Sequence, residues 1–362
     1  MRVEDKIKEI EDEIRRTPYN KATQHHIGKL KAKLAKLKDE SQRRGKPKGG
    51  AGYGLRKSGD ATAILVGFPS VGKSTLLNNL TNAKSEIAEY DFTTIDVIPG
   101  MMEYKGAKIQ ILDVPGLIRG ASAGKGRGKD VLSVVRSADL ILILIDILNL
   151  QQLEVVKKEL YDAGLRLNET PPKIYIKKRD SGGIEVSSTV ELSIEEDAIK
   201  GVLGEYRIHN ASVIIREDIT IDQLIDVTLG NRVYVPALTI LNKIDLVKED
   251  YLDEECKKHK DFIPISADKG INLDGLREAI FQNLDFIRVY MKPQRGKADF
   301  EEPLVVLRGS TIGDICRRLH KDFERKFKFA CVWGESAKFD GQMVGVGHIL
   351  EDKDILSIVI EI

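Results

Sequence analysis

The stretch Gly67-Phe68-Pro69-Ser70-Val71-Gly72-Lys73-Ser74 decides the fold. It matches the phosphate-binding loop GxxxxGK[ST] and lies between an apolar run and a helical pattern, as that loop requires. Glycines let backbone N–H groups curl around a β-phosphate, and the N-terminus of the helix adds a positive dipole. We expect Lys73 to reach the β- and γ-phosphate oxygens and Ser74 to bind Mg²⁺. The stretch predicts an α/β domain that binds a nucleoside triphosphate.

Apolar runs on both sides of this loop predict the rest of that domain. They are rich in Val, Ile and Leu and alternate with helical patterns, which is typical of a parallel sheet covered on both faces. The run 140–150 contains Asp146 and is too short to span a bilayer, so we interpret it as a buried strand. The predicted strands are residues 63–67, 108–112, 140–145, 237–241 and 262–265.

The segment Asp113-Val114-Pro115-Gly116-Leu117 follows one of these strands. Asp113 then lies at the carboxyl end of a strand beside the phosphate loop, where a carboxylate binds magnesium through water. Gly116 can donate its N–H to a γ-phosphate and lets the loop rearrange once that phosphate leaves.

Leu117 stands where Ras-like enzymes carry a glutamine, and leucine cannot orient the attacking water. We therefore expect slow hydrolysis assisted either by K⁺ or by a group from a partner. Ser70 stands where some enzymes with this loop anchor that ion with asparagine, which argues against the ion.

The tetrad Asn242-Lys243-Ile244-Asp245 follows another strand and selects the base. The Asp245 carboxylate can accept both the ring N–H and the exocyclic amino group of guanine, whereas adenine offers no such donor pair. GTP is therefore expected over ATP. Ser266 and Ala267 follow the last strand and can supply a backbone N–H to the guanine carbonyl oxygen.

Two segments are predicted to respond to the γ-phosphate. In Tyr90-Asp91-Phe92-Thr93-Thr94, a threonine hydroxyl is expected to join magnesium only when GTP is bound. The glycine-rich stretch 120–128 is expected to be ordered by nucleotide or by a partner.

Apolar residues at three- and four-residue steps predict a helical hairpin at the N-terminus. The steps run from Ile7 to Ile14 and from Ile27 to Leu37, and we expect the two stripes to pair with each other. Thr17 and Pro18 interrupt the pattern, and we expect Thr17 to cap the second helix with Pro18 in its first turn. The glycines of residues 49–54 then predict a linker.

Two further regions lie outside the nucleotide-binding pattern. The distance between the third and fourth strands leaves room for an inserted α+β subdomain, with strands at 173–177 and 211–215 and a turn at Gly182-Gly183. Near the C-terminus, the run 304–307 leads to Thr311 as a helix cap, and further strands are expected at 329–333 and 355–360. The predicted domains are 1–58, 59–164 with 236–290, 165–235 and 291–362.

The net charge of +1 conceals a basic segment. Residues 15–57 contain fourteen Lys or Arg against two acidic residues, a net +12. Such a segment suits a polyanion such as RNA, although a solvated helix face is the alternative. The C-terminal region has a second basic stretch with the same two interpretations, comprising Arg317, Arg318, Lys321, Arg325, Lys326 and Lys328.

The three cysteines form no Cys-x-x-Cys pair and the N-terminus lacks a signal-peptide core, so we expect a cytoplasmic protein with reduced thiols. Neither a membrane nor DNA is expected as a partner.

With these motifs in place, the whole chain resembles the developmentally regulated GTP-binding proteins of the Obg-related GTPases, and an archaeal member in particular. The phosphate loop with Thr75, the Phe92-Thr93-Thr94 segment, the 113–117 segment and the glycine-rich stretch carry the resemblance. It implies that Thr94 is the switch ligand of magnesium. It also implies a ribosomal-protein-like insertion, a C-terminal TGS domain of β-grasp shape, ribosome association, a role in translation and, in eukaryotic members, a stabilising partner protein.

The predicted site follows from the motifs and the resemblance together. Lys73, Thr94 and Gly116 are expected to act on the reaction, and Ser74, Thr94 and Asp113 to hold magnesium. The alternatives are a ribosome-assembly factor of the Obg type and a non-catalytic scaffold stabilised by GTP. The residues expected to bind GTP or GDP are Gly67, Phe68, Pro69, Ser70, Val71, Gly72, Lys73, Ser74, Thr75, Asp113, Val114, Pro115, Gly116, Leu117, Asn242, Lys243, Asp245, Ser266 and Ala267.

Overall fold

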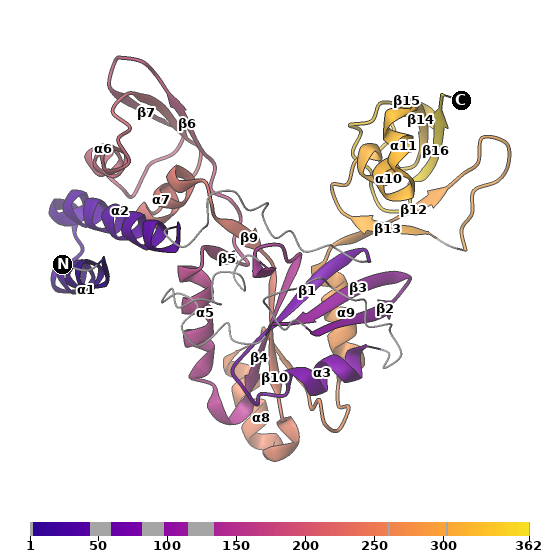
Figure 1. The fold of residues 1–362 in the computed structure, drawn as a ribbon, viewed down its shortest axis with the longest axis horizontal. Helices are drawn as coiled ribbons and strands as arrows, with labels where there is room; N and C mark the ends of the chain where they lie inside the picture. Colours follow the sequence, from indigo (N-terminus) through magenta and orange to yellow (C-terminus); the bar gives the residue numbers. More distant parts are fainter. Residues whose placement is uncertain are drawn as a thin grey trace. The chain divides into compact units, whose positions relative to one another are not determined.

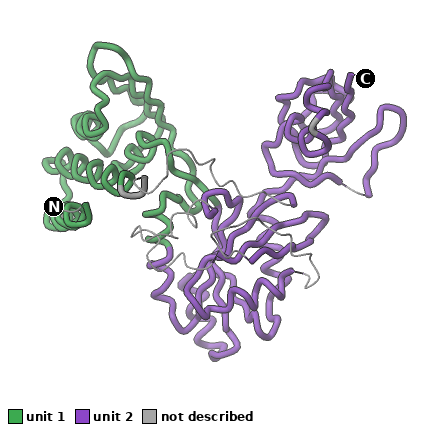
Figure 2. The backbone as a smooth tube through the Cα atoms, viewed as in Figure 1, with its two compact units in different colours: residues 1–53, 119–132, 157–235 green, residues 54–118, 133–156, 236–362 purple. Residues whose placement is uncertain are grey.

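The computed structural model describes residues 3–43, 59–81, 98–114, 134–259, 261–301 and 303–361. The chain divides into two compact units, coloured separately in Figure 2: unit 1 comprises residues 1–53, 119–132 and 157–235, and unit 2 comprises residues 54–118, 133–156 and 236–362. Within the described ranges, no helix combines the length and the apolar character needed to cross a bilayer.

Unit 2 is built around a six-stranded sheet with the order β11-β10-β4-β1-β3-β2 (Figure 1). Every neighbouring pair is parallel except β2 and β3. All five strands predicted from the apolar runs are present, and the predicted parallel-rich α/β fold is confirmed. The strands are β1 (Ala61–Val66), β2 (Ile98–Tyr104), β3 (Ala107–Asp113), β4 (Leu140–Asp146), β10 (Ala237–Asn242) and β11 (Phe262–Pro264).

The strand order fixes where the nucleotide site lies. Strand β1 is fully buried between β3 and β4, so the loop that follows it opens at the carboxyl edge where the strand order reverses. Helices α3 (Lys73–Leu80) and α9 (Leu273–Asn283) share one hydrophobic core with the sheet. Leu76, Leu276 and Ile280 belong to this core and are fully buried. Other elements of this domain are η1 (Ile147–Asn149), η2 (Ile244–Leu246) and α8 (Glu249–Lys258), while α5 (Gln152–Asp162) begins in unit 2 and ends in unit 1.

Unit 1 contains the predicted α+β insertion. Its three-stranded sheet has the order β6-β8-β7, and the two positive-φ glycines Gly182 and Gly183 make the turn between β6 and β7. A short parallel pair, β5 with β9, leads into and out of the insertion. The elements are β5 (Leu165–Leu167), β6 (Ile174–Lys178), β7 (Ile184–Ser188), α6 (Glu196–Glu205), β8 (Ala211–Ile215), α7 (Ile221–Leu229) and β9 (Val233–Val235).

The N-terminal helices α1 (Val3–Arg16) and α2 (Lys21–Arg43) are present as predicted, but two details differ. The helices do not bury their apolar residues only against each other, because Ala32 of α2 joins the core of the insertion. Thr17 does not cap α2: its hydroxyl donates back to the Glu13 carbonyl at the end of α1. Asn20 Oδ1 accepts the Thr23 N–H at 3.1 Å and caps α2 instead.

The C-terminal part of unit 2 is the predicted β-grasp domain. A mixed five-stranded sheet, ordered β13-β12-β16-β14-β15, packs one face on α10 (Ile312–Leu319). Thr311 caps this helix as predicted, in a reciprocal capping box with Asp314. The other elements are β12 (Phe286–Met291), β13 (Leu304–Leu307), α11 (Lys321–Arg325), β14 (Phe327–Trp333), β15 (Gln342–Val344) and β16 (Ile355–Ile360).

Candidate nucleotide site

The phosphate loop is held by two close backbone approaches that only glycine permits. A Cβ on Gly72 would lie 2.4 Å from Asn242 Nδ2, and Gly72 has a φ of 98°. A Cβ on Gly67 would lie 2.5 Å from the carbonyl oxygen of Leu144 in β4. The loop therefore packs directly against Asn242 and the central sheet, which fixes the conformation of the loop.

Lys73 begins α3 and folds over the loop. Its ammonium donates to the carbonyl oxygens of Gly67 at 3.1 Å and Phe68 at 3.0 Å. Burial lowers the pKa of this ammonium, while the negative charge of Asp113 opposes that shift. The cation thus lies at the mouth of a loop of backbone N–H groups, where it can bind phosphate oxygens.

Ser74 and Asp113 form a candidate magnesium site. The Ser74 hydroxyl donates to Asp113 Oδ2 at 3.1 Å. Asp113 is 4% exposed, and its other oxygen, Oδ1, is buried without a hydrogen-bond partner among the described residues. A buried carboxylate oxygen needs a donor or a cation, and hard oxygen ligands suit Mg²⁺. These residues therefore fit the ion.

Asn242 connects the phosphate loop to the loop 266–269, which we name the base loop after its predicted contact with guanine. Its side-chain amide donates to the Val71 carbonyl at 2.8 Å, and its side-chain oxygen accepts the Ala267 N–H at 2.9 Å. Asn242 is 2% exposed, so both hydrogen bonds are shielded from water. One side chain therefore sets the distance between the two halves of the predicted site.

Lys243 has a positive φ of 65°, and a carboxylate from the neighbouring strand holds its side chain. Asp146 pairs with Asn242 in the register between β4 and β10, and its Oδ2 lies 2.8 Å from the Lys243 ammonium. Its Oδ1 accepts the Leu148 N–H at 3.0 Å and caps η1.

Asp245 is exposed at the same edge and faces the base loop. Its Oδ1 accepts the Ser266 hydroxyl at 2.6 Å, and that hydroxyl in turn accepts the Lys269 N–H. The contact predicted between the Ala267 N–H and guanine stays a prediction. It requires that N–H to be shared with Asn242, as three-centre hydrogen bonds allow.

The structure brings together the predicted residues of the phosphate loop, Asp113 and the base motifs within unit 2. The two predicted switch segments, 90–94 and 120–128, lie outside the described residues. So do four site residues, Thr94, Pro115, Gly116 and Leu117, whose roles stay predictions.

Sequence reasoning missed two residues of this site. Asp146 was noticed only as the charge that interrupts an apolar run, although its position at the carboxyl end of a strand was a usable signal. Asn79 lies on α3, and its amide donates to the Ala267 carbonyl at 2.6 Å. Asn79 belongs to no motif, so only the packing of α3 beside the base loop shows that it contributes to the site.

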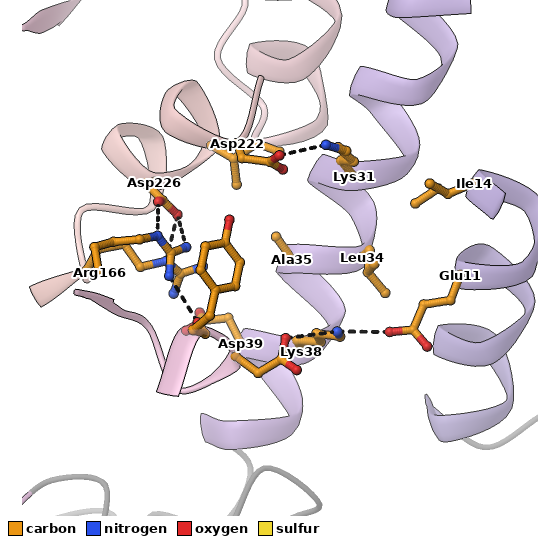
Figure 3. Close-up of a pocket in the computed structure, with 14 residues that line it drawn as sticks. Glu11, Ile14, Lys31, Leu34, Ala35, Lys38, Asp39, Arg166, Asp222 and Asp226 are labelled. Carbon is orange, nitrogen blue, oxygen red and sulfur yellow. Dashed lines mark hydrogen bonds and ion pairs between the residues drawn. The ribbon is translucent and has the colours of Figure 1, made fainter. Parts of the chain in front are cut away.

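A cavity of about 240 Å³ lies in unit 1 between α2, the insertion and α1, but its cations are paired within the protein (Figure 3). Lys31 lies 2.6 Å from Asp222, and Lys38 lies 2.9 Å from Glu11. Arg166, 3% exposed, makes two hydrogen bonds of 2.6 and 2.7 Å to Asp226. These ion pairs link different elements of unit 1 and indicate a structural role, and we call them the brace of unit 1.

Three family models match successive parts of the chain. A model described as 50S ribosome-binding GTPase matches residues 62–178, and a model of the C-terminal region of that domain matches residues 181–286. A TGS-domain model matches residues 287–360.

Several relatives match over nearly their whole length. A GTP-binding protein of Methanocaldococcus jannaschii is 60% identical over 100% of this chain and 94% of its own. Developmentally-regulated G-protein 3 of Arabidopsis thaliana is 47% identical over 98% of each chain. Developmentally-regulated GTP-binding protein 1 of Xenopus laevis is also 47% identical, over 98% of each chain.

Proposed function

Because the chain belongs to the developmentally regulated GTP-binding proteins of the Obg-related GTPases, we propose that it is a GTP-hydrolysing switch that associates with ribosomes or structured RNA. The observation that carries the nucleotide part is the Asn242 bridge, which ties the phosphate loop at Val71 to the base loop at Ala267.

Each residue of the proposed site has a separate role. Lys73 binds phosphate oxygens, Asp245 recognises the donor edge of guanine, and Ser74 with Asp113 holds Mg²⁺. The ion, when bound, neutralises negative charge on the phosphates. The proposed contacts of Thr94 and Gly116 with the γ-phosphate make the state of the protein depend on hydrolysis.

Nucleotide affinity with and without chelated magnesium tests the metal part of this proposal. We expect EDTA to weaken GTP binding by the wild-type protein and to have a much smaller effect on Asp113→Asn, whose amide replaces the ligand charge. The matched control is Asp268→Asn on the base loop, where the carboxylate is 77% exposed and should keep the full magnesium dependence. Wild-type affinity that does not respond to EDTA would contradict the assignment.

The proposed RNA association rests on exposed cations of the hairpin. Lys31 and Lys38 are paired within unit 1, so they contribute little to an external surface. Lys21, Lys29 and Lys33 of α2 are exposed, and exposed cations release counterions from a polyanion when they bind it.

Point substitutions test this face better than a truncation, because Ile27 and Leu30 of α2 are buried in unit 1. Changing Lys21, Lys29 and Lys33 together to alanine should lower the slope of log affinity against log salt by about 2 for ribosomes or structured RNA. The control changes three exposed lysines elsewhere, Lys158, Lys248 and Lys257. Equal slopes in the two variants would mean that the α2 face is only solvated.

An assembly factor of the Obg type is the alternative within the same class. Sedimentation separates the two proposals, because a translation factor should travel with complete ribosomes and an assembly factor with isolated subunits.

A further inference from the structure

The basic stretch predicted in the TGS domain does not offer all of its charge to a partner. Arg317 pairs with Asp314, one turn earlier on α10, and with Glu324 on α11. Arg318 donates to the Val305 carbonyl at 2.6 Å and pairs with Asp60. A surface that binds a polyanion must therefore use other cations of this domain.

Such cations line a cleft of about 540 Å³ between the loop 292–301 and the ends of β14 and β16. Three lysines face it, Lys292, Lys297 and Lys353, against one carboxylate, Asp340. Arg288 and, to a lesser degree, Lys353 lower the pKa of Asp352, but among the described residues none of the three lysines has a carboxylate oxygen within the ion-pair distance of 4.0 Å. The lining of the cleft therefore carries more positive than negative charge.

Two aromatic side chains line the same cleft. They are Phe300 and Trp333. Phe300 is 61% exposed, and the Tyr290 ring packs against it with the two ring centroids 5.0 Å apart. The Lys292 ammonium lies 4.0 Å from the centre of the Trp333 ring. An exposed ring held in place beside lysine ammonium groups is a combination that binds single-stranded nucleic acid, since bases stack on the ring and phosphates contact the cations.

We propose that this cleft binds single-stranded RNA, with one base stacked on Phe300 and the adjoining phosphates contacting Lys292, Lys297 and Lys353. The inference rests on the proposed association with ribosomes or RNA and assigns it a second, base-dependent contact. An acidic peptide would satisfy the lysines but would leave the exposed ring of Phe300 without a stacking partner, so RNA fits the cleft better.

Trp333 is the only tryptophan in the chain, so its fluorescence reports on this cleft alone. The full-length protein is titrated with an eight-nucleotide single-stranded RNA while tryptophan emission is followed. We expect saturable quenching, no quenching by heparin, which carries charge without bases, and about tenfold weaker RNA binding for Phe300→Ala.

The control variant is Phe339→Ala, since Phe339 is 65% exposed in the same domain but does not line the cleft. It should bind RNA like the wild type. Equal losses in the two variants, or an unchanged affinity in Phe300→Ala, would overturn the proposal. Displacement of the RNA by polyglutamate with the same quenching would also overturn it and would favour an acidic protein partner.

Failure of this proposal can be told apart from failure of the proposed function. Ribosome sedimentation that persists in Phe300→Ala, together with unchanged oligonucleotide binding, would reject the cleft and leave the α2 face as the contact. Two results together support the cleft as a separate site. Phe300→Ala should bind the oligonucleotide more weakly, and the variant with Lys21, Lys29 and Lys33 changed should keep the tryptophan quenching of the wild type.

Discussion

Replacing Asp146 by asparagine should weaken guanine-nucleotide binding without unfolding the protein. Asp146 Oδ2 lies 2.8 Å from the Lys243 ammonium, and its side chain is 10% exposed against 32% for Lys243. Asparagine keeps a side-chain oxygen that can accept the Leu148 N–H, so the cap of η1 should remain, since Asn and Asp cap helices about equally well. It removes the negative charge that holds the Lys243 ammonium. Losing a partly buried, charge-assisted hydrogen bond costs about 1 to 2 kcal/mol, a factor of about 5 to 30 in Kd.

The assay is equilibrium binding of a fluorescent GDP analogue, combined with thermal unfolding of the same variants. Asp146→Asn should bind more weakly at an unchanged Tm, whereas Asp146→Ala should lose both affinity and the η1 cap and should therefore unfold at a lower temperature. An unchanged Kd in Asp146→Asn would refute the reasoning, since Lys243 would then be positioned without this carboxylate.

Three further predictions follow from the site and from the brace of unit 1. Asp245→Asn should shift preference from GTP to xanthosine triphosphate, at a cost of about 2 to 5 kcal/mol in GTP binding, measured by competition; an unchanged preference would place the base elsewhere. Arg166→Ala leaves Asp226 buried with one partner fewer and should lower the free energy of unfolding by about 3 to 5 kcal/mol in urea; a loss below about 1 kcal/mol would contradict the brace. Hydrolysis should be faster in K⁺ than in Na⁺ at equal ionic strength if the ion assists, and Leu117→Ala should change it only modestly in either salt; equal rates would exclude the ion.

The sheet was predictable because its strands are continuous apolar runs with motifs at their carboxyl ends. The edge strand β2 was not, because Pro99 and Gly100 interrupt its pattern and Ile98 is 51% exposed. An edge strand tolerates proline since one side of its backbone has no partner strand, so the local signal for a strand is weak. The capping of α2 was misassigned for a similar local reason: Thr17 and Asn20 both suit a cap, and only the contact with Glu13 decides between them.

The candidate site was predictable where a motif fixes residue type and spacing, as at Lys73, Asp113 and Asn242. The contacts of its supporting residues were not predictable, even where position at the end of a strand marks a residue such as Asp146, because these contacts depend on which elements pack together. Asp146 reaches Lys243 only because β4 and β10 are neighbours in register, and Asn79 reaches the base loop only because α3 packs beside it. Spacing along the chain carries no record of either contact.

Single-turnover hydrolysis of GTP tests the central claim most directly. The full-length protein is mixed in excess with γ-labelled GTP and magnesium, and phosphate release is followed with and without ribosomes, beside Lys73→Ala as the control that should lose productive binding. The account predicts slow release of phosphate from GTP and none from ATP, with no release by the variant. GTP that stays bound and intact in both conditions would contradict it and would favour a scaffold stabilised by GTP.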